Sequence, residues 1–255
     1  MKYHLYLFAF ILACCKGPSK KSHEQGTAPA LLAKNPAYET CWSGTLNGNI
    51  PVFVHYHVDS NLVIGKIIYL NTKERQPIPL IGTIEEDRHY RLLEFDSTGH
   101  ISGIIDGRPG SEGFSGTWIS PVTKKEFPVS LLPADTLIQS PDTRADEDQI
   151  PGSYHYRYGE TGYSGELTVN RMGNTIGFSI VSVTSIENGA NTAMVEKDTA
   201  TMNGPGFVYT IPGSDSCTCS IRFYKAFAHI SSANGYCDGQ FGHNATIDGI
   251  YLKTK

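Results

Sequence analysis

The chain has 255 residues, a formal net charge of −4 at pH 7 and only 18% charged residues, with 26 glycines and 14 tyrosines. An isoelectric point near 6.1 and a sequence without a basic cluster argue against nucleic-acid binding, which depends on clustered Lys and Arg. We therefore expect no nucleic-acid partner. The length suits one large or two small domains.

The N-terminus, MKYHLYLFAFILACC, places Lys2 before an apolar run at residues 5–13. This run is too short to cross a hydrocarbon core of about 30 Å as a helix, but it has the length of a secretory signal core. The following Ile-Leu-Ala-Cys, residues 11–14, resembles the lipobox of bacterial lipoproteins, in which the cysteine is lipidated. The resemblance implies a signal peptide at 1–13 and lipidation of Cys14. A frame shifted to Cys15 and an ordinary cleaved signal are the alternatives.

A lipid on Cys14 implies a protein of the bacterial cell envelope, at the outer membrane, whose membrane partner is reached through the anchor alone. Each buried acyl CH₂ contributes about 0.8 kcal/mol, so several chains together hold firmly. Residues 14–36 are rich in Lys, Ser, Gly, Pro and Ala and predict a flexible tether. No later segment is apolar over the roughly 18 residues that a membrane-spanning helix needs.

Apolar and polar residues alternate in short runs that are separated by Gly, Pro, Asn and Asp, a pattern typical of β-strands. No segment has a helical period with caps. The sequence predicts an all-β fold, with a first unit of about eight strands at residues 37–133. Its expected strands are 40–46, 50–58, 62–70, 78–85, 90–95, 101–105, 114–119 and 127–132.

The motif WSGTL at 42–46 returns as YSGEL at 163–167, and Gly116-Thr117-Trp118 resembles Gly249-Ile250-Tyr251. After each copy of the motif, Gly48-Asn49, Phe53 and Val58 match Gly173-Asn174, Phe178 and Val183 at a slightly larger offset. Residues 134–151 are acidic and contain prolines, which predicts a linker. We therefore expect two related tandem β-units, 37–133 and 152–255.

A large aromatic residue at the start of a first strand can close one end of a small barrel, and a neighbouring glycine permits close backbone approach. With about eight strands in a meander, each unit resembles the calycin group, the lipocalin-like and avidin-like barrels. The resemblance implies two tandem small antiparallel barrels. Two-sheet sandwiches fit the same alternation and stay open as the alternative.

Four cysteines follow the N-terminal pair, and an exported chain enters an oxidising compartment in which disulfides form. Cys219 with Cys237, or Cys217 with Cys237, would join neighbouring strands; with Cys41, three complete pairings exist. The C-x-C pair with Cys237 and His243 also offers zinc ligands, although zinc sites more often space their cysteines by two to four residues. The sequence thus favours a disulfide, and we expect no cofactor.

Two further patterns suggest sites. His55 and His57 share one face of a predicted strand and could bind one metal ion together, with His89, His100 or Asp59 as a third ligand. The alternative is a polar outer face without metal, and we assign none. Tyr154, Tyr156 and Tyr158 alternate on another strand, with Tyr163 nearby. Such a stripe either stacks a sugar or apolar ligand or packs between strands.

The sequence has no Gly-x-Ser-x-Gly elbow and no phosphate-binding loop. We therefore expect a non-enzymatic binding module for a small apolar ligand, a glycan or an envelope protein. The segment 217–253 resembles lysozyme-inhibitor-type domains, with a cysteine-bracketed hairpin and a terminal Gly-x-Tyr strand, and this implies a protein inhibitor as one alternative. A metal-dependent hydrolase that uses His55 and His57 is the other.

Overall fold

The fold is described from a computed structural model. The structure describes residues 37–255 apart from 174, 185–189, 215, 234–236, 238 and 243. All of these residues belong to one compact unit, Pro36–Lys255. The predicted signal peptide, Cys14, Cys15 and the tether lie outside the described residues.

Eight strands follow one another in the first half, as the alternation of apolar and polar residues predicts. They are β1 (Thr40–Leu46), β2 (Ile50–Asp59), β3 (Leu62–Tyr69), β4 (Ile78–Ile84), β5 (Tyr90–Phe95), β6 (His100–Pro109), β7 (Phe114–Ile119) and β8 (Glu126–Pro133), with the short 3-10 helix η1 (Glu86–Arg88) before β5. The expected all-β class is confirmed.

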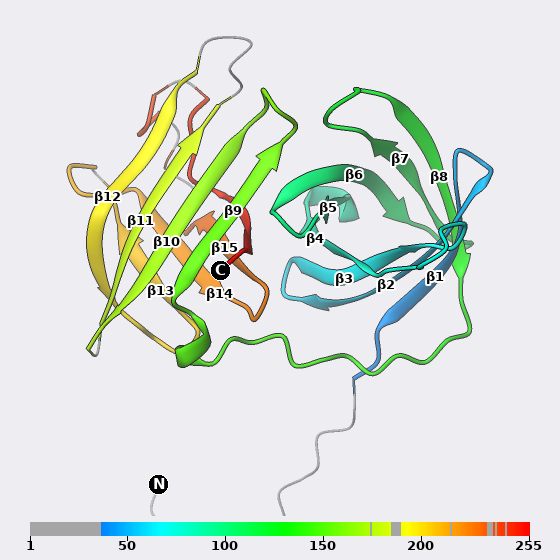
Figure 1. Cartoon of the computed structure of the whole chain (residues 1–255), viewed down its shortest axis with the longest axis horizontal. Helices are drawn as coiled ribbons and strands as arrows, with labels where there is room; N and C mark the ends of the chain where they lie inside the picture. The colour runs from blue at the N-terminus through cyan, green and yellow to red at the C-terminus, as the bar shows by residue number, and fades with distance from the viewer. Residues whose placement is uncertain are drawn as a thin grey trace, which may run out of the picture. The chain divides into compact units, whose positions relative to one another are not determined.

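These eight strands form a closed barrel (Figure 1). Each pairs antiparallel with the next, and β8 returns to pair with β1 from Trp42↔Pro133 to Leu46↔Val129. Gly44 of the WSGTL motif makes this closure possible, because a Cβ there would lie 2.1 Å from the backbone oxygen of Ser130. For this half the barrel prediction is confirmed and the sandwich alternative is wrong.

The interior of the barrel is filled with side chains. Trp42 is 7% exposed, donates its indole N–H to the Tyr56 hydroxyl at 3.2 Å and lies 6.2 Å from the Phe114 ring. Aliphatic residues from every second position of the strands complete this core. The aromatic residue of the first motif therefore packs inside the barrel, as its place at the start of the first strand predicts.

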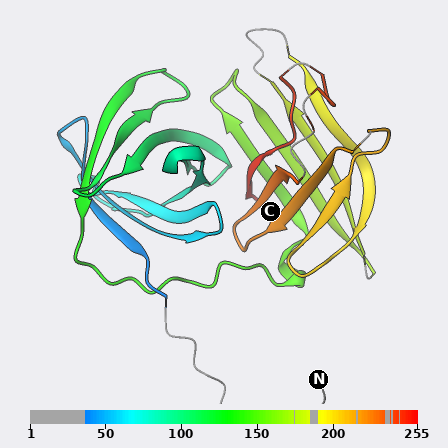
Figure 2. The ribbon, with the colours of Figure 1, turned by 180° about the vertical axis from the view of Figure 1, so that it is seen from behind.

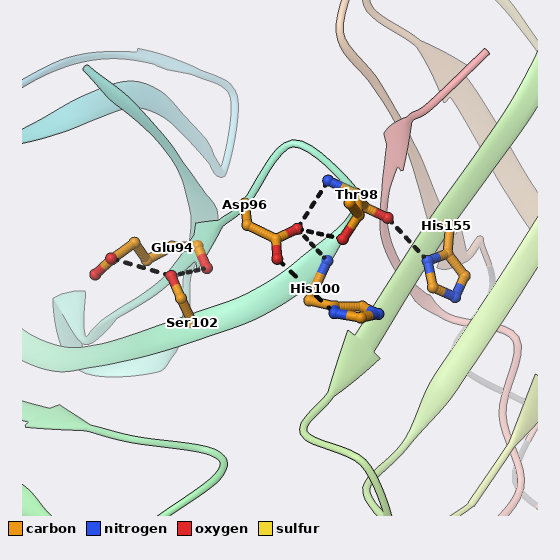
Figure 3. A network of polar contacts seen from close by, with 6 residues as sticks. All are labelled: Glu94, Asp96, Thr98, His100, Ser102 and His155. Carbon is orange, nitrogen blue, oxygen red and sulfur yellow. Dashed lines mark hydrogen bonds and ion pairs between the residues drawn. The ribbon is translucent and has the colours of Figure 1, made fainter. Parts of the chain in front are cut away.

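One carboxylate also lies in this interior. Glu94 is 4% exposed and accepts hydrogen bonds from the Tyr69 hydroxyl (2.9 Å), the Trp118 indole N–H (3.1 Å) and the Ser102 hydroxyl (3.0 Å). Figure 3 shows the contact with Ser102. Gly103 leaves room for the cluster, since a Cβ there would lie 2.2 Å from the Trp118 nitrogen. Burial and then the charge of Glu94 raise the pKa of Tyr69.

The second half contains eight more strands. They are β9 (Gly152–Tyr158), β10 (Ser164–Met172), β11 (Thr175–Val183), β12 (Thr192–Thr201), β13 (Gly206–Thr210), β14 (Thr218–Phe223), β15 (Phe227–Ser232) and β16 (Gly249–Lys253). Successive strands pair antiparallel, and β16 returns to pair with β9.

The exception is the step from β12 to β13. Among the described residues β12 pairs only with β11, and β13 pairs only with β14. We call this unpaired step the seam; both strands are visible in Figure 2, which shows the fold from behind. A second closed barrel is therefore not confirmed, although the strand order up to the seam is that of the first.

Residues 134–151 join the two strand sets. They contain no strand, only the 3-10 helix η2 (Glu147–Gln149), and isolated β-bridges tie Gln139 to Tyr38 and Arg144 to Tyr224. The acidic segment thus contacts both halves along its course.

The recurring motifs occupy equivalent strands only if β10, the second strand of the second half, is matched with β1. WSGTL lies in β1, which pairs with β8, whereas YSGEL begins β10, which pairs with β9. Gly-Thr-Trp lies in β7 and Gly-Ile-Tyr in β16. Strand β8, the last of its set, therefore corresponds to β9, the first of the next.

Single residues support this correspondence unevenly. Gly48 and Gly173 both adopt left-handed conformations, with φ of 69° and 62°, in the turns after the motif. The match of Phe53 with Phe178 was wrong as a structural equivalence, because Phe53 pairs with Ser43 on the outer face of the barrel. Phe178 is instead 2% exposed and lies in the core.

Two hydrophobic cores meet at the barrel wall formed by β3 to β6. Leu92 belongs to the barrel core, whereas its neighbour Leu93 belongs to the core of the second strand set. Ile64, Ile81 and Ile104 likewise face the second set from the outside of the barrel. The contact between the two halves is therefore apolar and continuous with a core.

Candidate functional site

A crevice lies where the two strand sets meet. Two cavities of about 420 Å³ each open on either side of one group of residues, and we call them together the crevice. Both cavities are lined by Arg91 of β5, Tyr158 of β9, and Asp248, Gly249 and Ile250 at β16. The crevice thus draws residues from both halves of the chain.

The alternation of β9 positions Tyr158. Tyr154 and Tyr156 precede it on the same strand face and are buried, at 0% and 5% exposure. The Tyr154 hydroxyl donates to the Ile150 carbonyl at 2.5 Å. Tyr156 hydrogen-bonds to a serine hydroxyl of β11 at 2.9 Å. The predicted stripe is therefore packing along most of its length; Tyr156 lines the first cavity, and Tyr158 lines both cavities.

The crevice offers aromatic rings beside charges. Tyr158 lines both cavities and Tyr163, which is 40% exposed, lines the first. Burial raises the pKa of Tyr158 to about 12, although the Arg91 guanidinium opposes the shift, so the phenol is neutral at neutral pH. A neutral phenol both donates and accepts hydrogen bonds.

Charges of both signs line the same space. Arg91 Nη1 lies 3.6 Å from Asp106 Oδ2, and Lys124 lines the first cavity. Asp248 Oδ2 accepts a hydrogen bond from Ser232 at 3.0 Å. The crevice therefore offers charged hydrogen-bond donors and acceptors beside the tyrosine rings.

The second cavity adds an uncharged imidazole. His229 lines it, and burial, followed by the charge of Arg222, lowers the pKa of His229 to about 4. At neutral pH this ring is therefore a hydrogen-bonding group without charge.

A turn of the barrel fixes β9 beside the crevice (Figure 3). Asp96 Oδ1 accepts hydrogen bonds from the Thr98 N–H (2.8 Å), the Thr98 hydroxyl (2.7 Å) and the His100 N–H (2.9 Å). The turn presents the Thr98 carbonyl to His155 Nδ1 on β9 at 3.2 Å. Next to this contact β6 and β9 pair in parallel as far as Tyr158.

His55 and His57 share the outer face of β2, as expected, and both contact the carboxylate of Glu39. The Nδ1 of His55 is hydrogen-bonded to Glu39 Oε2, and the Nδ1 of His57 lies 3.4 Å from Oε1. Glu39 has a side chain only 4% exposed. These contacts use the Nδ1 atom of each ring and do not involve either Nε2.

The expected third ligands lie elsewhere. His89 and Arg91 pair with Asp106, and Asp59 accepts a hydrogen bond from Tyr224 at 3.2 Å. His100 belongs to the turn described above. In the described part of the chain, the group of three or more ligand atoms close enough for one ion is instead Cys217, Cys219 and Cys237.

The cysteine pairing is also defined. Cys217 and Cys237 form a disulfide with a Cα–Cα distance of 4.8 Å, which is one of the two expected pairings. The alternative of Cys219 with Cys237 is not formed: Cys219 and Cys41 are free and buried, at 0% and 6% exposure. His243 lies outside the described residues.

Sequence reasoning missed several residues of these clusters. Glu39 precedes the first strand, where nothing in the pattern marks a buried carboxylate. Arg91 and Asp248 are surface-type residues that become crevice residues only because the two strand sets meet there. A usable signal existed in Leu92-Leu93, since adjacent apolar residues on a strand indicate burial on both faces.

Comparison with known proteins adds no relative: no family model, curated sequence or solved structure matches the chain. Of the helices that the structure describes, none has the length and apolar character to cross a membrane.

Proposed function

We propose that the chain is a lipid-anchored, non-enzymatic binding module of the bacterial cell envelope that takes a glycan in the crevice. The observation that carries the proposal is the meeting of two 420 Å³ cavities at Tyr158, with charged groups on both sides. Small-ligand sites favour concave surfaces between packed units, lined by aromatic side chains and a few convergent polar groups.

The lining favours a glycan over the other expected ligands. A sugar presents a face of C–H groups, which stacks on an aromatic ring, and a rim of hydroxyls, which both donate and accept hydrogen bonds. Tyr158 and Tyr163 offer rings, and Arg91, Lys124 and Asp248 offer charged partners for hydroxyls. A wholly apolar ligand would desolvate these charges further and offer them no new hydrogen bonds, which is costly.

The crevice proposal is tested with tyrosine variants. Native mass spectrometry of the chain from its own host's envelope first shows whether a ligand is carried. Calorimetric titration with muropeptides and with chito- and cello-oligosaccharides then measures affinity. Tyr163→Ala should weaken binding at least about 10-fold, or about 1.4 kcal/mol. Tyr38→Ala is the matched control, because Tyr38 is 54% exposed and lies outside the crevice lining. Equal affinities in the two variants would contradict the proposal.

The anchor rests on the lipobox resemblance at residues 11–14. Metabolic labelling with an alkyne-bearing fatty acid in a bacterial host tests it. The parent chain and Cys15→Ser should incorporate the label and fractionate with membranes, whereas Cys14→Ser should do neither. Label in the Cys14→Ser chain would show that Cys15 carries the lipid instead. A parent chain without label would contradict the lipid anchor.

We also propose that β9–β16 act as a second barrel-like unit closed by side chains at the seam. The Tyr209 hydroxyl of β13 donates to Asp198 Oδ2 of β12 at 2.6 Å. The Phe178 ring of β11 lies 4.9 Å from that of Phe207 on β13. Hydrogen exchange that protects β12 and β13 as strongly as β10 would support this reading; rapid exchange of both would oppose it.

Two alternatives make different predictions. A lysozyme-inhibitor-type function predicts that residues 152–255 protect peptidoglycan from lysozyme, and it becomes the leading proposal if no sugar binds. A metal-dependent hydrolase predicts stoichiometric metal that is lost in His57→Ala. The contacts of Glu39 use the Nδ1 atoms and leave each Nε2 for a metal, as in many histidine–metal sites. The expected third ligands weigh against the hydrolase, because they pair with other residues.

A further inference from the structure

Three sulfur atoms lie together at one end of the second strand set. Those of Cys217, Cys219 and Cys237 are all within 4.8 Å of one another. Cys217 is bonded to Cys237, and the Cys219 sulfur lies 4.0 Å from that of Cys237. Cys217 and Cys219 are 1% and 0% exposed. Neither the crevice nor the barrel uses this group.

The local sequence explains the arrangement. Residues i and i+2 of an extended segment point to the same face, so the C-x-C spacing sends both side chains into the core at the start of β14. The turn before the strand is fixed by the Cys217 N–H, which donates to Ser214 Oγ at 3.1 Å, and by the Cys217 carbonyl, which accepts from the Ile211 N–H at 2.9 Å. Cys237 then approaches both sulfurs from a distant part of the chain.

A structural disulfide needs only two of these cysteines. The third, Cys219, brings a further sulfur to within contact of the bond while remaining a thiol. Three sulfurs of which no two are far apart form the donor set of a thiolate metal site.

We propose that, once the Cys217–Cys237 bond is reduced, the three cysteines form a thiolate site for a tetrahedral borderline or soft metal ion such as Zn²⁺. A dithiol reductant supplies the two electrons and two protons that convert the bond into two thiols, and itself becomes a disulfide. The metal then displaces one proton from each of the three thiols. The inference does not depend on the proposed glycan binding or on the anchor.

The distances suit such an ion. Two sulfurs about 2.3 Å from one tetrahedral ion lie about 3.8 Å apart. Cys219 and Cys237 are already at 4.0 Å, and Cys219 lies within 4.8 Å of Cys217. Side-chain rotations after reduction are therefore sufficient, without movement of β14.

A carboxylate stands near the same group. Burial, and after it the charge of Asp248, raises the pKa of the Cys219 thiol. Among the described residues, the ligand atoms close enough for one ion are those of the three cysteines, so water would complete the fourth position of a tetrahedral ion. Because Asp248 also lines both cavities of the crevice, the metal would lie beside the crevice wall.

The experiment uses the chain from Lys16 onward, which removes the anchor cysteines and keeps the whole compact unit 36–255. Half of the sample is reduced with a phosphine, which competes little for metal, and both halves are titrated with Co²⁺ and then with Zn²⁺. The reduced chain should take up one Co²⁺ with the thiolate-to-cobalt absorption of a tetrahedral site, and Zn²⁺ should displace it. The unreduced chain should bind neither.

Variants identify the ligands. Cys219→Ser should bind at least about 100-fold more weakly after reduction, while its disulfide and fold before reduction are unchanged. Cys41→Ser is the matched control, because Cys41 is the other buried free cysteine and lies in β1. It should bind as the parent does.

Three results would overturn the proposal. They are a reduced parent that takes up no Co²⁺, a Cys219→Ser chain that binds as tightly as the parent, and weakened binding in Cys41→Ser. Circular dichroism of the reduced chain with and without Zn²⁺ detects unfolding caused by reduction. A reduced chain that unfolds and does not refold with Zn²⁺ would also contradict the proposed site.

Discussion

Removal of the interior carboxylate tests whether the barrel depends on a polar cluster within its apolar core. Glu94→Ala deprives the Tyr69 hydroxyl and the Trp118 indole N–H of their acceptor. A buried donor without an acceptor costs about 1–3 kcal/mol. Both donors are only partly buried, so water replaces some of the loss. We expect Glu94→Ala to lower the free energy of unfolding by about 2–3 kcal/mol.

Urea unfolding followed by tryptophan fluorescence measures this loss, because the chain has two tryptophans and one of them, Trp118, contacts Glu94. A double-mutant cycle isolates the pair. Tyr69→Phe should cost about 1–2 kcal/mol in the parent. It should be neutral or stabilising in Glu94→Ala, where the hydroxyl has already lost its acceptor. Additive losses across the cycle would refute the reasoning, as would a Glu94→Ala variant with parental stability.

Three further predictions follow from single contacts. Tyr209→Phe removes the hydrogen bond to Asp198 across the seam and should lower the free energy of unfolding in urea by about 0.5–1.5 kcal/mol. An unchanged midpoint would show that this hydrogen bond does not contribute to stability. Gly44→Val places a Cβ 2.1 Å from a backbone oxygen of β8, so near-UV circular dichroism should show a loss of fixed tertiary structure, and a native spectrum would contradict the close approach. Burial alone would raise the pKa of Asp96, but the hydrogen bonds of its turn outweigh burial and lower it. Ionised Asp96 therefore stabilises the fold at neutral pH, and the stability difference between the parent and Asp96→Asn should shrink as the pH falls below about 4; a constant difference would be inconsistent with this sign.

The strands could be predicted because their cause is local. Burial of every second residue gives each strand an apolar residue at every second position, and Gly, Pro, Asn and Asp mark the turns between the strands. The close approach at Gly44 could be predicted because a glycine lies beside the aromatic residue of the motif. The strand count fitted a barrel and a sandwich equally, and the pairing of β8 with β1 in the structure decides for the barrel.

The candidate sites could be predicted only in part, because they depend on contacts between distant segments. The spacing of Cys217 and Cys219 indicated one shared face, but it could not say which of them pairs with Cys237, a residue 20 positions from Cys217. The two histidines of β2 were visible, and Glu39 was not. Beyond Leu92-Leu93 and the tyrosines of β9, the crevice has no local signature, since Tyr158 and Arg91 become neighbours only when β6 and β9 pair.

The seam bears on whether the protein associates with other copies of itself. A closed barrel leaves no free strand edge for another chain to pair with, whereas β12 and β13 each keep one edge without a strand partner in the described structure. Such edges are templates for strand exchange and aggregation. Glu196, Lys197 and Asp198 place charges of both signs along β12, and charged edge strands resist pairing with a copy of themselves. The second half can therefore remain incompletely closed by backbone pairing and still avoid strand pairing with other copies of the chain.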